Sequence, residues 1–391
     1  MLFYLKCFIL VLGDNMNDRI VEIVSKFQFR GNLVDIIENS QGNINSTYIL
    51  VFQEKEEINK YLLQKINQNV FKEPYLVMKN IELVTEHIKK KLEILNDSCH
   101  KTLSFIKTKK DEILCIYIND NGEKEYYRAF EYIDNCISYN NFDEVETLKE
   151  DVAYNAGKGF GLFHRLLCDF PTNMLADTIP NFHNTPSRFN DLLLSIENNV
   201  TNRAFEYPLE IVELIARIKE CSIIWNNLGK SIPLRVTHND TKLNNILMDK
   251  TTNQAIAVID LDTVMPGSIL FDIGDGIRSA CSNSFEDELD KEKIFLNLDL
   301  TKVYLKGYLE EMAPFLEKDE VNYIGISIKI LTYELAMRFL TDYINGDTYF
   351  KIKYDKHNRD RFINQFTLLK DIENKLDEIN LYVNDLYNVL I

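Results

Sequence analysis

The first third of the chain alternates between apolar and polar residues in short runs, a pattern that is typical of β-strands. A turn rich in small polar residues lies between the first two runs, at 38–46, and a second turn follows at 119–122. Pro74 precedes a longer amphipathic segment, which predicts a helix at 75–95, and a shorter helix is predicted at 17–29. The strands are predicted at residues 33–37, 47–53, 60–66, 112–118 and 126–133.

Farther along the chain, the pattern changes to the longer period of amphipathic helices, with one further strand predicted at 255–259. A small mixed domain followed by a mainly helical one predicts an α+β fold with two lobes. We place a five-stranded N-lobe at residues 17–135 and a large C-lobe at 136–391. Residues 1–16 are interpreted as an N-terminal extension.

Composition and charge agree with a division into two lobes and limit the classes of binding partner that we expect. A chain of 391 residues is long for a single core, and its hydrophobic content of 46%, with 23 Phe and 20 Tyr, can fill two. The formal net charge is −16. Because such a surface repels phosphate backbones and anionic lipids, we expect neither nucleic acid nor a membrane as a partner.

The cysteines and the N-terminal residues indicate in which cellular compartment the protein is expected. The seven cysteines are scattered and form no CxxC pair, so neither a disulfide framework nor structural zinc is expected, and a reducing cytoplasm fits best. The apolar run at residues 1–12 is interrupted by Lys6 and is too short to cross a bilayer. It also lacks the basic start and the small-residue cleavage site of a signal peptide. We therefore expect a cytoplasmic protein.

The most informative segment is a polar loop in the C-lobe. Its residues His238, Asp240, Lys242 and Asn245 match the spacing H-x-D-x-K-x-x-N, and an apolar strand farther on delivers Asp260 at its end. Short loops of this composition often only turn the chain, and an Asp at a strand end is often only a cap. Here the H-x-D-x-K-x-x-N loop is followed at a suitable distance by the strand that ends at Asp260, and both come after a five-stranded lobe. This combination favours a kinase over a loop that only turns the chain.

Phosphoryl transfer explains these residue types. Asp240 is the candidate base that accepts a hydrogen bond from the attacking hydroxyl, and Lys242 can steady the transferring phosphoryl group. Asn245 and Asp260 offer an amide oxygen and a carboxylate as ligands for Mg²⁺ bound to ATP. His238 is expected to hold the loop in shape by hydrogen bonding.

At this point the sequence resembles a known group, the kinase-like enzymes that include the aminoglycoside phosphotransferases and choline kinases. Within that group it is most similar to the N-acetylhexosamine 1-kinases. The resemblance implies a bilobal protein-kinase-like fold, ATP with Mg²⁺, and transfer of phosphate to the anomeric hydroxyl of an N-acetylated hexose; we expect a monomer. It is carried, in order along the chain, by residues 42–48, 61–67, 232–249, 258–262, 265–278 and 338–350.

The resemblance makes residues 42–48 the hairpin that covers the phosphates. Ser46 and Thr47 are its candidate nucleotide-binding residues, because they offer hydroxyl and backbone donors. The hairpin lacks a G-x-G-x-x-G pattern, so a simple turn remains the alternative.

Lys65 is the candidate for the strand lysine that pairs with the phosphates of ATP. Gln64 precedes it, and only one of the two side chains can face the nucleotide, since side chains alternate along a strand. A solvated lysine is the alternative. The helix partner of Lys65 would be Glu82 or Glu86, and the sequence does not decide between them.

Three residues of the C-lobe are candidates for binding the acceptor. The resemblance places Arg338 and Tyr349 at the sugar, where a planar donor and an aromatic surface suit hydroxyls and a ring face. Arg278 is the third candidate. Its alternative role is a structural ion pair with Asp272 or Asp275.

The role of Asp262 is left open, and His183 is not included in the predicted site. Asp262 either binds the metal or orients a neighbour. His183 follows Phe182 in a segment that also resembles the family, but a histidine beside a phenylalanine is more often a core residue.

The sequence therefore predicts an ATP-dependent kinase of an N-acetylhexosamine, either GlcNAc or GalNAc. One alternative is a kinase of choline, another amino alcohol or an aminoglycoside, whose cationic acceptor would require a pocket rich in carboxylates. The sequence also leaves open a kinase-like module without catalysis and a sugar-binding protein without turnover. The intact Asp240, Asn245 and Asp260 argue against loss of catalysis.

Overall fold

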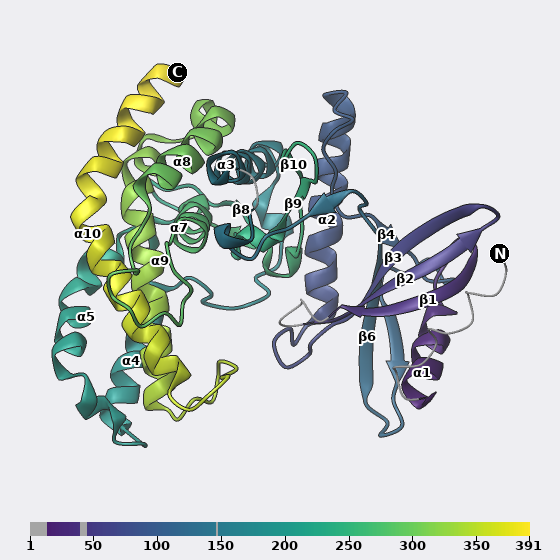
Figure 1. Cartoon of the computed structure of the whole chain (residues 1–391), viewed down its shortest axis with the longest axis horizontal. Coiled ribbons are helices and arrows are strands. Elements are labelled where there is room, and N and C mark those ends of the chain that lie inside the picture. The colour runs from purple at the N-terminus through teal and green to yellow at the C-terminus, as the bar shows by residue number, and fades with distance from the viewer. Residues whose placement is uncertain (1–13, 40–44, 146–147) are drawn as a thin grey trace. The chain divides into compact units, whose positions relative to one another are not determined.

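The computed structural model describes residues 14–39, 45–145 and 148–391 of the chain (Figure 1). Most of the predicted extension and the middle of the predicted turn at 38–46, including Gly42, lie outside the described residues. Helix α2 (Pro74–Ile94) contributes to both of the compact units into which the chain divides. The first unit comprises residues 1–85 and 102–135, and the second comprises residues 86–101 and 136–391.

The first unit is built on an antiparallel sheet with the strand order β1-β2-β3-β6-β4, in which β5 also pairs with β6. Its strands are β1 (Asn32–Asn39), β2 (Ser46–Glu54), β3 (Glu57–Lys65), β4 (Phe105–Ile106), β5 (Cys115–Ile118) and β6 (Lys124–Glu131). The five predicted strands are present. Strand β4 has only 2 residues, too few for an alternating pattern to reveal it, so the described sheet has one strand more than predicted.

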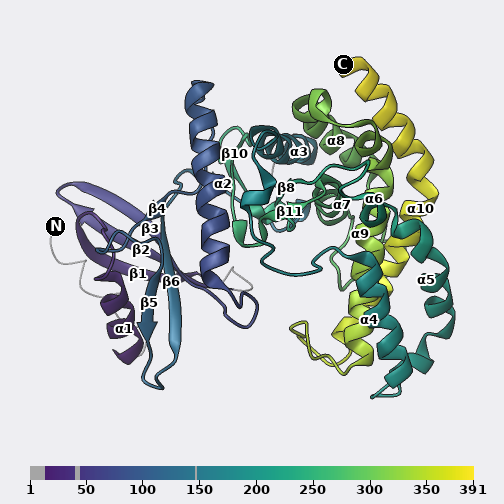
Figure 2. The ribbon, with the colours of Figure 1, turned by 180° about the vertical axis from the view of Figure 1, so that it is seen from behind.

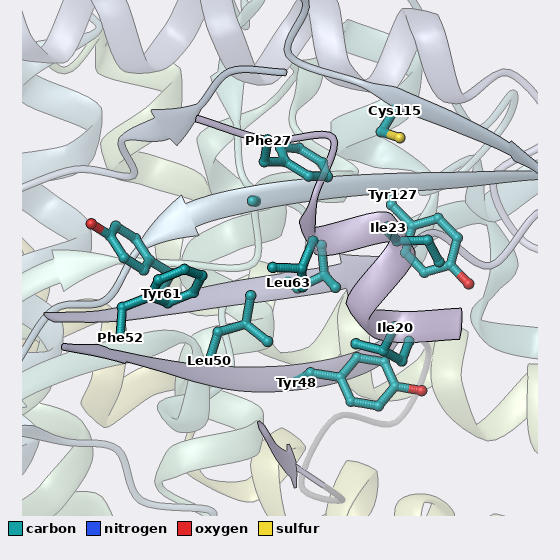
Figure 3. Close-up of a cluster of buried hydrophobic side chains, with 12 residues drawn as sticks. Ile20, Ile23, Phe27, Tyr48, Leu50, Phe52, Tyr61, Leu63, Cys115 and Tyr127 are labelled. Atoms are coloured by element: carbon teal, nitrogen blue, oxygen red, sulfur yellow. The ribbon is translucent and has the colours of Figure 1, made fainter. Parts of the chain in front are cut away.

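Helix α1 (Asp14–Val24) packs on one face of this sheet through an apolar cluster (Figure 3). Ile20 and Ile23 of the helix meet Leu50 and Leu63 of the strands, and all four side chains are buried. The helix ends earlier than predicted. The reason is a long-range contact, because Phe27 forms a β-bridge with Thr108 instead of continuing the helix.

The second unit is mainly helical, as the sequence predicted. Helices α4, α7 and α10 pack against α9, which is buried along most of its length and begins at a capping box between Glu317 and Glu320. No helix in the described part of the chain is long and apolar enough to cross a membrane. The helices are α3 (Lys149–Leu166), α4 (Thr185–Asn198), α5 (Pro208–Cys221), α6 (Ile223–Asn227), α7 (Ile269–Ala280), α8 (Leu298–Met312), α9 (Lys318–Ile344) and α10 (His357–Leu390).

Helices α3 and α8 approach each other closely because glycines stand where they meet. A Cβ on Gly157 would overlap the carbonyl oxygen of Tyr304, and a Cβ on Gly307 would overlap the carbonyl oxygen of Tyr154. This tight packing holds α3 in place. Helix α3 in turn delivers His164 toward the loop described below.

Two small sheets position the polar loops of the second unit. Strand β8 (Arg235–Thr237) pairs with β11 (Met265–Gly267), and Figure 2 shows both beside α7. Strand β9 (Ile246–Asp249) lies between β7 (Cys136–Ile137) and β10 (Ala255–Val258). Only β10 was predicted; β7, β8 and β11 have two or three residues each, and β9 has four, as β10 does. Together they bring the loop after β8 next to the end of β10.

Candidate active site

The loop that follows β8 is held by a buried carboxylate from helix α7. The side chain of Asp272 is fully buried, and its two oxygens accept hydrogen bonds of 2.6 and 2.7 Å from the backbone N–H groups of His238 and Asn239. A ring nitrogen of His164 also lies 2.8 Å from one Asp272 oxygen. Hydrogen bonds to an ionised acceptor are strong, so the backbone of this loop has little freedom.

His238 connects the loop to the end of β10. Its Nε2–H donates to the carbonyl oxygen of Ile259 at 2.8 Å, and its Nδ1 accepts a hydrogen bond of 3.2 Å from the backbone N–H of Asp240. The hydroxyl of Thr263 donates to the carbonyl oxygen of His238 at 2.6 Å. The structure thus gives His238 the loop-holding role that the sequence suggested.

The carboxylate of Asp240 is about a quarter exposed and has a different partner on each oxygen. Lys242 Nζ lies 2.7 Å from Oδ1, and the side-chain amide of Asn245 donates to Oδ2 at 3.1 Å. The same amide donates to the carbonyl oxygen of Asp240 at 2.8 Å. The negative charge of Asp240 raises the pKa of Lys242, so the lysine is charged at neutral pH. The structure therefore brings together the predicted base, cation and amide.

The two predicted metal ligands, Asn245 and Asp260, are linked through the backbone. The N–H of Ile259 donates to the carbonyl oxygen of Asn245 at 2.9 Å, and Asp260 follows in the left-handed conformation, with φ 58° and ψ 55°. Because the amide nitrogen of Asn245 is engaged with Asp240, its side-chain oxygen is the atom that remains for a metal.

This donor set fits magnesium. Mg²⁺ is usually held by one or two protein oxygens together with substrate phosphates, and Asn245 and Asp260 supply an amide and a carboxylate oxygen. Asp262 is buried, at 3% exposure. In the part of the chain that the structure describes, no three His, Cys, Asp or Glu side chains gather into a metal-binding group.

Arg278, one of the three predicted acceptor residues, is buried in an ion pair. Its Nη2 lies 2.8 Å from Asp275, and its Nη1 lies 3.1 Å from Glu286 and 3.3 Å from the side-chain oxygen of Gln365. Burial by itself would raise the pKa of Asp275, but Arg278 and Lys242 together lower it below its ordinary value. Arg278 thus has the structural partner that the sequence left as an alternative, and Asp275 is that partner.

Arg338 and Tyr349, the other two acceptor candidates, lie together. The Arg338 guanidinium lies 5.8 Å from the ring centre of Tyr349 and 5.2 Å from that of Phe350. The segment that carries both rings is fixed by Asp342, whose carboxylate accepts hydrogen bonds from the backbone N–H groups of Thr348, Tyr349 and Phe350 at 2.8 to 2.9 Å. Tyr349 is 71% exposed, so its ring is available for contact.

His183 lies among residues of the same unit. Its Nδ1 lies 3.2 Å from a carboxylate oxygen of Glu334, whose other oxygen accepts a hydrogen bond from the hydroxyl of Thr185. Its ring packs against Phe271 of α7, with ring centres 5.1 Å apart. The histidine is buried, as a core residue would be, but it is part of a polar cluster.

The nucleotide-binding candidates of the first unit lie on β2 and β3. Ser46 is exposed at the start of β2, and Thr47 is buried and accepts a hydrogen bond of 3.1 Å from the side chain of Gln64. Lys65 Nζ lies 2.8 Å from Glu125 of β6. Burial lowers the pKa of Lys65 below its ordinary value.

Glu125 and His164 are contributors that sequence reasoning missed. Glu125 binds Lys65 across neighbouring strands, in place of a glutamate from helix α2. Neither residue carries a local signal, since both depend on contacts between distant segments. Asp272 did carry one, because it is an acidic residue in the otherwise apolar first turn of α7.

Comparison with known proteins shows one family model and several solved structures to which this chain is similar. Residues 111–305 match the phosphotransferase enzyme family, APH. Among solved structures, the chain is similar to a microcompartment-associated aminopropanol kinase, with a TM-score of 0.57 and 14% identity over 93% of this chain and 99% of that chain. It is also similar to a choline kinase from Cryptosporidium parvum Iowa II, with a TM-score of 0.52 and 14% identity over 94% and 99% of the two chains.

A third similar structure is an amicoumacin kinase in complex with AMP-PNP, Ca²⁺ and Ami. Its TM-score is 0.56, with 11% identity over 92% of this chain and 93% of that chain. At these identities the similarity establishes the fold. The chain has a kinase-like fold with a β-sheet N-lobe and a helical C-lobe, as the sequence predicted.

Proposed function

We propose that this chain, whose residues 111–305 match the phosphotransferase enzyme family, phosphorylates the anomeric hydroxyl of an N-acetylhexosamine with ATP. The arrangement of Asp240, Lys242 and Asn245 supports the phosphoryl-transfer part of this proposal. The pairing of Arg338 with Tyr349 supports the choice of a sugar.

In the proposed reaction, Asp240 accepts a hydrogen bond from the anomeric hydroxyl and takes its proton as the oxygen attacks the γ-phosphorus of ATP. The new oxygen–phosphorus bond forms as the bond from the γ-phosphorus to the bridging oxygen of ADP breaks. An anomeric hydroxyl is more acidic than an ordinary alcohol, so an aspartate is a sufficient base. Asn245 orients this aspartate through its two hydrogen bonds, to the carboxylate and to the backbone.

Charge is neutralised by the neighbours of Asp240. Lys242 stays protonated beside Asp240 and offers a cation to the transferring phosphoryl group. The side-chain oxygens of Asn245 and Asp260 would hold Mg²⁺, which when bound with ATP neutralises the phosphates. On the nucleotide side, the exposed Ser46 and the neighbouring Thr47 are the proposed phosphate contacts.

The observation that favours a sugar is the uncompensated charge of Arg338. Within the described residues no carboxylate lies within ion-pair distance of its guanidinium, whereas Arg278 has two such partners. A cationic acceptor such as choline would be repelled by this guanidinium. The hydroxyl oxygens of a neutral sugar can accept hydrogen bonds from the N–H groups of Arg338, and a face of the sugar ring can pack on Tyr349.

Contacts within the second unit connect the helix of Arg338 with the loop of Asp240. Glu334 lies one turn before Arg338 on α9 and contacts His183. The ring of His183 packs against Phe271 of α7, and the next residue, Asp272, holds the loop that carries Asp240. These contacts link Arg338 with the proposed catalytic loop within the second unit and support a role in acceptor binding.

The proposal is tested by incubating the protein with ATP, Mg²⁺ and a panel that includes GlcNAc, GalNAc, other hexoses, choline, ethanolamine, aminopropanol and an aminoglycoside. Phosphorus NMR of the product locates the new phosphate. We expect phosphate on the anomeric oxygen of an N-acetylhexosamine. Phosphate on another carbon would refute the 1-kinase assignment and leave the kinase assignment standing, whereas turnover of the amines alone would establish the cationic alternative.

A further inference from the structure

One ring nitrogen of His183 is buried and has no hydrogen-bond partner among the described residues, so we consider whether a ligand binds there. The side chain is only 8% exposed, and its Nε2 has no hydrogen-bond partner among the described residues. Buried polar atoms of side chains are usually hydrogen-bonded, and leaving one unsatisfied is costly. A histidine with a purely structural role in the core usually has both ring nitrogens hydrogen-bonded. The Nε2 atom therefore needs a separate explanation.

Glu334 determines which chemistry this nitrogen offers. Its carboxylate lies 3.2 Å from Nδ1, and a carboxylate only accepts hydrogen bonds, so Nδ1 carries a proton. In the neutral ring, Nε2 is then an acceptor, suited to the proton of a hydroxyl group. The hydroxyl of Thr185 occupies the second oxygen of Glu334 and fixes the carboxylate.

The ring is also fixed in orientation by its neighbours. It packs against Phe271 with an angle of 31° between the planes and meets the edge of Phe182 at 4.7 Å between ring centres. Phe271 belongs to α7, the helix whose Asp272 holds the catalytic loop. The imidazole therefore lies in a rigid setting that is built on the same helix as that loop.

We propose that Nε2 of His183 accepts a hydrogen bond from a hydroxyl of the acceptor sugar other than the one that is phosphorylated, and that Glu334 is the positioning residue that holds the neutral ring in the tautomer with its proton on Nδ1. This inference rests on the proposed function, since it assigns a binding group to the same acceptor. It gives the site a means of selecting neutral, hydroxyl-rich acceptors, in addition to Arg338 and Tyr349.

The test compares the wild type with His183→Phe, which keeps an aromatic ring on Phe271 and removes both nitrogens. Initial rates are measured with the acceptor and with a panel of its monodeoxy analogues, each lacking one hydroxyl. We expect the variant to raise the acceptor KM roughly tenfold to a hundredfold, with the ATP KM within about twofold of the wild type. With the wild type, the KM of one deoxy analogue should exceed that of the acceptor by the same factor. With the variant, that analogue and the acceptor should have about the same KM.

Phe182→Leu is the matched control, because it disturbs the packing of the same ring and removes no polar atom. Its acceptor KM should stay close to that of the wild type. Glu334→Gln should raise the acceptor KM, and the ring-nitrogen NMR signals of His183 should change from the Nδ1–H form to a mixture of tautomers. Thermal unfolding of each variant shows whether it is folded.

The inference is overturned if a folded His183→Phe keeps the wild-type acceptor KM. It is also overturned if removing each hydroxyl raises the KM by the same factor in the variant as in the wild type. If no sugar is phosphorylated at all, the proposed function fails instead. The same comparison with whichever alcohol is phosphorylated then tests His183 separately, since an unchanged KM for that alcohol would overturn its role as a binding residue.

Discussion

The carboxylate of Asp272 accepts a hydrogen bond of 2.6 Å from the backbone N–H of His238. The next N–H along the loop, that of Asn239, binds the other oxygen of the same carboxylate. A helix and a loop that are far apart in sequence are thereby joined at the point where the loop turns toward Asp240. The geometry of the proposed active site thus depends on a residue that has no part in the proposed chemistry.

Replacing Asp272 should therefore damage both stability and catalysis. Asp272→Asn keeps the size but turns one acceptor into a donor that faces a backbone N–H, and we expect it to lower the free energy of unfolding by about 3 kcal/mol or more. Chemical denaturation measures this loss. Asp299→Asn is the matched control, because Asp299 is an exposed acid in the first turn of α8 and should change stability very little. Equal losses in the two variants would contradict the anchoring role.

Lys65 provides a test of the nucleotide side. Its charge is held by Glu125, and its pKa is lowered by burial. We expect Lys65→Met to raise the ATP KM less than about threefold and to lower the free energy of unfolding by no more than about 1 kcal/mol, as for other partly exposed ion pairs. Lys242→Met should reduce turnover much more. A tenfold rise in the ATP KM of Lys65→Met would instead support the role of strand lysine.

Arg338 should govern affinity for the acceptor. Arg338→Lys keeps the charge but loses the planar group over Tyr349 and Phe350, and we expect the acceptor KM to rise roughly tenfold. The ATP KM should not change. Arg361→Lys is the control, since Arg361 lies in the same way over Phe339 but is not a predicted acceptor residue. Steady-state kinetics with each substrate varied in turn separates the two effects.

Much of the fold followed from the sequence, and so did the local part of the site. The five longer strands and the kinase-like fold could be predicted because alternation and motif spacing are local properties. Asp240, Lys242 and Asn245 lie within six residues of one another, so the chain itself brings them together. Strand β4, with 2 residues, was too short for any pattern.

The remaining features depend on contacts between distant segments. Lys65 meets Glu125 because β3 and β6 pair in a particular register, which no spacing reveals. Arg278 pairs with Asp275, which lies one turn before it on α7, whereas Asp272 holds the loop. The cluster of His183 and Glu334 joins residues that are 151 positions apart.

His357 should make stability depend on pH. Its side chain is fully buried, and burial lowers its pKa below the ordinary value, with Arg361 adding to the shift and Asp287 opposing it. The unfolded chain therefore binds the proton more readily, so stability is complete above a pH of about 6.5 and falls as the pH drops from there through the folded-state pKa. His357→Gln should flatten this part of the profile, measured by thermal unfolding between about pH 5 and 8. An unchanged slope in the variant would contradict this account.

The central claim is that Asp240 is the base of a phosphoryl transfer. The most direct measurement is the single-turnover rate of Asp240→Asn with ATP, Mg²⁺ and the preferred acceptor, together with the affinity for ATP by calorimetry. We predict that the rate falls roughly 10²- to 10⁴-fold, while the affinity for ATP stays within about threefold, because Asp240 serves the hydroxyl and Asn245 with Asp260 serve the metal. A folded variant that keeps the wild-type rate would contradict the account.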